Sequence, residues 1–121
     1  MIHILNFGKR LSEEQKIIVR STKSFCESYL KPRVIQDYNK ERIDRNIFIE
    51  FGKMGLLGPK IKGYTCLGET NTTYGLIAKE IETIDSGYRS MFSVQSSLVM
   101  KPIFDYANDN LKQKYLPKLA S

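Results

Sequence analysis

The segment DSGYRSMFSVQSSLVM, residues 85–100, places a single arginine, Arg89, among serines and apolar side chains. On a helix with about 100° per residue, four serines spaced by four, three and four positions form one stripe, with Arg89 at its edge. These serines are Ser86, Ser90, Ser93 and Ser97. A solvated helix face would carry Lys and Glu instead. The pattern therefore indicates a specific anionic partner for the guanidinium, whose planar fork matches a carboxylate well.

Two interpretations of this helix face remain open. In the structural one, small serines let neighbouring helices pack closely, and Arg89 pairs with Asp85 or Glu82. In the functional one, the serines line a ligand channel, and Arg89 binds the anionic end of the ligand. The two are compatible, because a nearby acid can hold the arginine in place until the ligand arrives. Met91, Val94 and Leu98 form a second stripe, which we expect to face the core.

The elements that must position Arg89 are all predicted to be helical. SEEQ is a capping box, with Ser12 as N-cap and Gln15 three residues later, and it starts a first helix. Pro32 interrupts this helix, and a helical pattern resumes over residues 34–38. A second helix fits Asn46 to Met54 and ends at a glycine.

Two further helices are expected at about Thr72 to Asp85 and Tyr88 to Met100, and Pro102 should kink or break the latter. Asn108 is predicted to cap a last helix. Its expected buried residues are Leu111, Tyr115, Leu116 and Leu119. No segment alternates well enough to be a strand. The sequence therefore predicts an all-α bundle of five or six helices.

The glycine-rich segment GLLGPKIKGYTCLGET, residues 55–70, is expected to be a loop. It lacks the GK followed by Ser or Thr of a phosphate-binding P-loop. It also follows a helix and not a strand, which disfavours a dinucleotide-binding fingerprint.

Composition excludes several function classes. The 121 residues carry a net charge of +6, but Lys and Arg are scattered among acids, which favours a solvated surface over nucleic-acid binding. No apolar run approaches the roughly 20 residues of a membrane span. The only histidine, His3, leaves no basis for a catalytic triad or a histidine-based metal site. Cys26 and Cys66 form no metal-binding motif and are expected to be reduced thiols.

Three stretches carry a family resemblance: MGLLGPKIKGYTCLG, YGLIAKEIETIDSGYRS and MFSVQSSLVMKPI. They resemble the acyl-CoA dehydrogenase family, and look most like its glutaryl-CoA dehydrogenase subgroup. The resemblance implies a flexible segment over residues 1–11 and an α-helical N-terminal domain over residues 12–121. It also implies a middle β-domain and a C-terminal helical domain that this chain lacks. We therefore expect a fragment that is inactive by itself.

The resemblance further implies the activity of the whole enzyme, which is oxidative decarboxylation of glutaryl-CoA to crotonyl-CoA. The cofactor would be FAD, bound mainly by the other two domains, and the catalytic glutamate would also lie outside this chain. An electron-transfer flavoprotein would accept the electrons, and the full-length enzyme would be a homotetramer. A bacterial cytoplasm or a mitochondrial matrix would suit it equally.

Residue by residue, Arg89 matches the family arginine that binds the distal carboxylate of glutaryl-CoA. Ser93 matches a serine near that carboxylate, Glu82 an acidic residue near the arginine, and Ser90 is a weaker neighbour. Lys101 departs from the histidine expected in close relatives. Two alternatives remain open: a short-chain acyl-CoA dehydrogenase or oxidase with a monocarboxylic substrate, and a truncated helical interaction module without catalysis.

Overall fold

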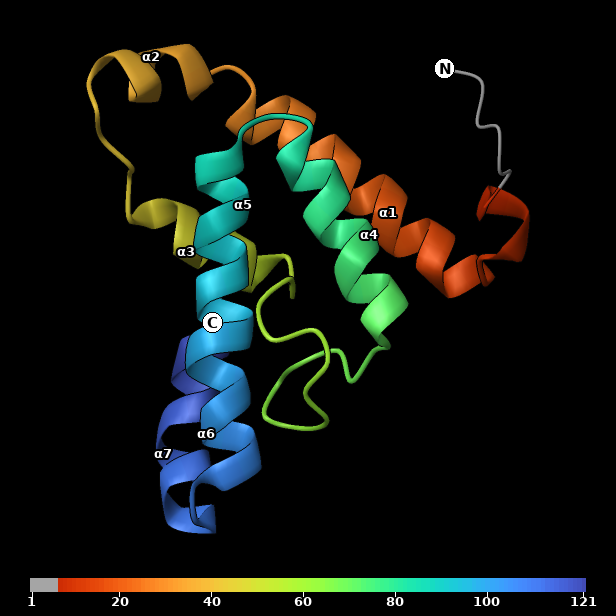
Figure 1. The fold of residues 1–121 in the computed structure, drawn as a ribbon, viewed down its shortest axis with the longest axis vertical. Coiled ribbons are helices and arrows are strands. Elements are labelled where there is room, and N and C mark those ends of the chain that lie inside the picture. The colour runs from red at the N-terminus through yellow and green to blue at the C-terminus, as the bar shows by residue number, and fades with distance from the viewer. Residues whose placement is uncertain (1–6) are drawn as a thin grey trace.

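The computed structural model describes residues 7–121, and within them every regular element is helical. The elements are η1 (Phe7–Arg10), α1 (Glu13–Phe25), η2 (Cys26–Leu30), α2 (Val34–Asn39), α3 (Asn46–Lys53), α4 (Asn71–Glu82), α5 (Ser86–Ser93), η3 (Val94–Met100), α6 (Lys101–Tyr106) and α7 (Asp109–Ala120). The π-helical segment η2 continues α1, and the π-helical segment η3 joins α5 to α6 (Figure 1). The prediction of an all-α bundle of five or six helices is therefore confirmed. The predicted flexible segment lies partly outside the described residues, and its last part contains η1.

Polar caps define where the helices begin. The Ser12 hydroxyl accepts a hydrogen bond from the Gln15 amide at 3.1 Å, and the Gln15 side chain accepts one from the Ser12 amide at 3.1 Å. The predicted capping box of α1 is thus present. Asn108 caps α7 as predicted. Asp85 does not end the preceding helix but caps α5, accepting hydrogen bonds from the Gly87 and Tyr88 amides at 2.7 and 3.2 Å.

The helix from α5 to α6 differs from the prediction. Pro102 neither ends nor interrupts it, since the chain remains helical from Ser86 to Tyr106. Its π-helical segment changes which side chains face inward, because a π-turn holds more residues than the 3.6 of an α-turn. Val94 and Leu98, predicted to be core, are exposed, whereas Met91 is buried as expected.

Buried apolar side chains from α1, η2, α3, α4, α5, η3 and α7, together with the glycine-rich loop, form the core. Figure 1 shows α1 beside α4, α7 beside α6, and α2 projecting at the far end of the molecule. The largest fully buried side chains include Phe51, Ile77, Phe92 and Leu116. In the last helix, the prediction of burial is correct for Leu116 but wrong for two exposed residues, Leu111 and Tyr115. Leu119 is only partly buried against the core.

Candidate substrate-binding site

The predicted site forms across the turn that joins α4 to α5. Glu82 is the last residue of α4, and Arg89 lies in the first turns of α5. The Arg89 Nε donates a hydrogen bond to Glu82 Oε2 at 2.7 Å, and Ser86 Oγ donates one to Glu82 Oε1 at 2.5 Å. The structure therefore selects Glu82 and not Asp85 as the acidic partner, since Asp85 serves as the helix cap.

Ser93 completes the contacts of the guanidinium. Arg89 Nη1 donates a hydrogen bond to Ser93 Oγ at 3.4 Å. The structure thus brings together three of the four predicted residues: Glu82, Arg89 and Ser93. Ser90 lies one residue beyond Arg89 and is half-buried, and its position on the helix is the only feature that links it to the site.

Electrostatics favours a fixed, ionised pair. The hydrogen bond from Ser86, followed by that from Arg89, lowers the pKa of the Glu82 carboxyl below its usual value. The Arg89 side chain is 36% exposed, and its two hydrogen bonds use two of five N–H donors. The remaining donors are available to an anion at the surface. Glu82 thus fixes the position of the guanidinium while using only one of its N–H donors.

Two rows of side chains run along α5 and η3 away from this pair. Arg89, Ser93 and Ser97 are spaced by four residues, and the Ser97 hydroxyl donates a hydrogen bond to the Tyr74 hydroxyl at 3.0 Å. Ser90, Val94 and Leu98 follow the same spacing in the adjacent row. Val94 and Leu98 are 46% and 71% exposed. A polar row ending in a guanidinium therefore lies next to an exposed apolar row.

The sequence reasoning missed Val94 and Leu98 as surface residues, because a constant helical period places them with Met91. One pattern in the sequence could have indicated that Val94 and Leu98 are exposed. Tyr88, Phe92, Ser96 and Met100 are spaced four residues apart, and the structure shows that all of them are buried. A strict α-helix would let such a row drift around the axis, whereas a π-turn keeps it on one side.

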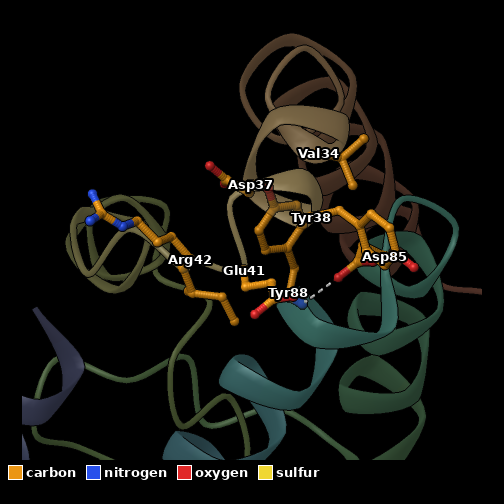
Figure 2. A pocket seen from close by; sticks show the side chains of 8 residues that line it. Val34, Asp37, Tyr38, Glu41, Arg42, Asp85 and Tyr88 are labelled. Atoms are coloured by element: carbon orange, nitrogen blue, oxygen red, sulfur yellow. Dashed lines mark hydrogen bonds between the residues drawn. The ribbon is translucent and has the colours of Figure 1, made fainter.

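A pocket that is open to solvent lies away from Arg89. A cavity of about 310 Å³ lies between α2, the turn after it and the first turn of α5 (Figure 2). Val34, Asp37, Ile43 and Tyr88 contribute to its walls, but Arg89 does not. Within the described residues, Arg89 thus stands on an open surface beside exposed apolar side chains.

The glycine-rich loop gives no sign of a phosphate cradle. Its Gly58 amide donates to the buried Ser96 hydroxyl at 3.0 Å, and the Glu69 amide donates to the Pro59 carbonyl. These two N–H groups are already used inside the fold and are not available to a phosphate. Residues 7–121 contain no cluster of three or more side chains suited to a metal ion. Over the same residues, no helix has the length and apolar character needed to cross a bilayer.

Comparison with known proteins relates this chain to acyl-CoA dehydrogenases. Residues 12–121 match the family model described as acyl-CoA dehydrogenase, N-terminal domain. A solved glutaryl-CoA dehydrogenase from Mycobacterium smegmatis, in complex with FADH2, is 34% identical with a TM-score of 0.93 over 97% of this chain and 30% of that one. A second structure of glutaryl-CoA dehydrogenase from the same organism is 37% identical with a TM-score of 0.90 over 94% of this chain and 30% of that one.

A curated relative has a different substrate in its name. The mitochondrial isovaleryl-CoA dehydrogenase of Bos taurus is 29% identical over 92% of this chain and 27% of its own length. The chain thus spans less than a third of the relatives it matches.

Proposed function

Because this chain belongs to the acyl-CoA dehydrogenase family, whose N-terminal domain model it matches, we propose that it forms one wall of a substrate site. The site would be that of a flavin-dependent enzyme similar to glutaryl-CoA dehydrogenase, and this wall would bind the distal carboxylate of the acyl chain. The observation that carries the proposal is Arg89, which Glu82 and Ser93 hold in place with N–H donors still free.

The chemistry of the surface supports a dicarboxylic substrate. A buried carboxylate is costly unless it is paired and hydrogen-bonded, and Arg89 supplies a matching fork. Val94 and Leu98 offer apolar contact for the methylene groups between the carboxylate and the thioester. When the rest of the enzyme covers this surface, exclusion of water strengthens the ion pair.

The reaction itself would take place on groups outside this chain. FAD, held by the remaining domains, would supply hydride acceptance, and the residues described above would bind and orient the acyl end. An electron-transfer flavoprotein as electron acceptor, a homotetramer and a bacterial cytoplasm or mitochondrial matrix belong to the same proposal. The high structural similarity to two glutaryl-CoA dehydrogenases supports it.

A chimera tests the role of Arg89. This chain would replace the aligned segment of the Mycobacterium smegmatis glutaryl-CoA dehydrogenase, and Arg89→Gln would be introduced. We expect kcat/KM for glutaryl-CoA to fall between about 10-fold and about 150-fold, because a hydrogen bond to a charged group contributes about 1.5–3 kcal/mol. Turnover of butyryl-CoA should change by less than about threefold, since it has no distal carboxylate.

The matched control is Arg20→Gln, which removes an exposed arginine from α1 and should leave both substrates unaffected. Flavin absorbance would confirm that each chimera is assembled. An equal loss with glutaryl-CoA and butyryl-CoA in Arg89→Gln would show that the arginine is structural.

The relative named for isovaleryl-CoA supports a second candidate, a dehydrogenase for monocarboxylic acyl-CoA. In that case the chimera with unaltered Arg89 would turn over isovaleryl-CoA or butyryl-CoA more efficiently than glutaryl-CoA. Arg89 would then serve to stabilise the α4–α5 turn through Glu82.

A further inference from the structure

Tyr88, the residue before Arg89, takes part in a buried polar contact that the binding site does not use. Its side chain is only 2% exposed, and its hydroxyl donates a hydrogen bond to Asp37 Oδ2 at 2.6 Å. The same carboxylate oxygen accepts a hydrogen bond from Arg33 Nε at 3.0 Å. Figure 2 shows Tyr88 extending from α5 toward α2, where Asp37 lies.

Arg33 extends this contact to two more segments. Its Nη1 donates to the Tyr29 hydroxyl at 3.1 Å, and its Nη2 donates to Asp44 Oδ2 at 2.8 Å. One guanidinium therefore joins η2, the middle of α2 and the segment before α3. Through Asp37, all of them are connected to the first turn of α5.

The protonation states suit this arrangement. Burial, and then the hydrogen bond to Asp37, raises the pKa of Tyr88, so its hydroxyl keeps its proton at neutral pH and acts as the donor. The hydrogen bond to Asp44 raises the pKa of Arg33, which stays charged. The contact between α2 and α5 thus consists of the charged side chains of Arg33 and Asp37 and the neutral hydroxyl of Tyr88.

The Tyr88 ring belongs to the hydrophobic core, but on its α2 side apolar packing is limited to the partly buried Val34. α2 has no buried residue, and the cavity of about 310 Å³ lies between it and Tyr88. The core packs against the ring, whereas α2 supplies no buried side chain, so the hydrogen bond to Asp37 is the contact that fixes the hydroxyl end of Tyr88 to α2.

The direction of Tyr88 matters for its neighbour. Asp85 fixes the start of α5 by capping, but a cap leaves the helix free to rotate slightly about its axis. Glu82 belongs to a different helix, so its hydrogen bond to Arg89 is kept only while the first turn of α5 keeps its orientation. A buried hydrogen bond one residue before Arg89 can maintain that orientation.

We propose that Tyr88 is a positioning residue for Arg89: its hydrogen bond to Asp37, braced by Arg33, sets the rotation of the first turn of α5. The consequence for substrate selection rests on the proposed function, whereas the placement of Arg89 does not. The first measurement therefore needs no substrate.

Hydrogen exchange of the Arg89 Nε–H, followed by NMR on the 121-residue chain, reports its hydrogen bond to Glu82 directly. Tyr88→Phe keeps the ring and removes the hydroxyl, and we expect the Nε–H to lose protection. Asp37→Asn keeps an acceptor for Tyr88 but removes the charge facing Arg33, so a partial loss is expected. The control Ser96→Ala removes a buried hydrogen bond from η3 and should leave this proton protected. Unchanged protection in Tyr88→Phe would overturn the proposal.

The second measurement uses the chimeric holoenzyme. Tyr88→Phe should raise KM for glutaryl-CoA between about 5-fold and about 100-fold, the cost of displacing a binding group by up to about 1 Å, and should leave KM for butyryl-CoA unchanged. Equal changes for both substrates would contradict the positioning role. Suppose that Arg89→Gln affects glutaryl-CoA and butyryl-CoA equally, while Tyr88→Phe still speeds hydrogen exchange of the Arg89 Nε–H. The proposed function would then fail and the positioning role of Tyr88 would stand.

Discussion

At the scale of single residues, the carboxylate of Glu82 connects the two halves of the α4–α5 turn. One oxygen accepts from Ser86 and the other from Arg89, and together these hydrogen bonds lower its pKa. A carboxyl whose pKa is lower in the folded state adds stability above its unfolded pKa, and this stability is lost as pH falls through the folded value. The pair should therefore persist until the solution is more acidic than the ordinary Glu pKa of about 4.3.

Removing either donor should raise the pKa of Glu82 toward its ordinary value. We expect a rise for both Ser86→Ala and Arg89→Gln, because Ser86 supplies the largest single contribution and Arg89 contributes both a hydrogen bond and its charge. A carbon-detected NMR titration of the Glu82 side-chain carboxyl measures this directly. Ser24→Ala, a change at an exposed serine of α1, should leave the titration unchanged. A Glu82 titration that is insensitive to both Ser86→Ala and Arg89→Gln would contradict the geometry.

At the scale of elements, the helix from α5 to α6 decides which side chains meet the ligand surface and which meet the core. Phe92, Ser96 and Met100 all face inward because η3 has wider turns. Ser96 is the polar member of this row, and its hydroxyl accepts the Gly58 amide at 3.0 Å. The π-helical segment thus fastens the glycine-rich loop to the core with one buried hydrogen bond.

Ser96→Ala should destabilise the chain by about 1–3 kcal/mol, because it leaves the buried Gly58 amide without its acceptor. Urea denaturation followed by circular dichroism measures the change in the free energy of unfolding. The exposed Ser24→Ala serves as the control and should stay within about 0.5 kcal/mol of the unaltered chain. Equal free energies for the two variants would mean that the loop does not depend on this hydrogen bond.

The same helix shows where prediction from sequence ends. Local signals were sufficient for the starts of α1 and α7, since the caps at Ser12 and Asn108 lie within three residues of their partners. The resemblance identified Arg89 and Glu82 correctly as neighbours. A constant helical period could not predict the exposure of Val94, because a π-helical segment shifts every later residue and only the four-residue spacing that starts at Tyr88 marks it.

At the scale of the whole molecule, hydrophobic periodicity could not predict the polar contacts between residues that are distant in sequence. Tyr88 and Asp37 are 51 positions apart, and neither residue type nor spacing indicates that they pair. The same holds for Ser96 and Gly58, which are 38 positions apart. The number and order of the helices follow from local patterns. The packing of the helices against one another depends on contacts between residues that are far apart in sequence, such as Tyr88 and Asp37.

Glycines at two helix positions test this packing. A Cβ at Gly52 of α3 would clash with the backbone of Ser121, which follows α7, whereas a Cβ at Gly75 of α4 would meet nothing within 4 Å. Both Gly→Ala changes gain about 1 kcal/mol of helix propensity, so the difference between them isolates the clash. Overpacking against backbone costs about 1–3 kcal/mol.

We therefore expect the free energy of unfolding of Gly52→Ala to lie about 1–3 kcal/mol below that of Gly75→Ala, with Gly75→Ala at or above the unaltered chain. Urea denaturation of the two variants under identical conditions measures this difference. The core residues Phe51 and Ala120 directly precede Gly52 and Ser121 in sequence, so a clash there is transmitted to the centre of the bundle. If the two variants are equally stable, residue 121 does not pack against α3, and α7 is held by its other contacts, including buried Leu116 and Ala120.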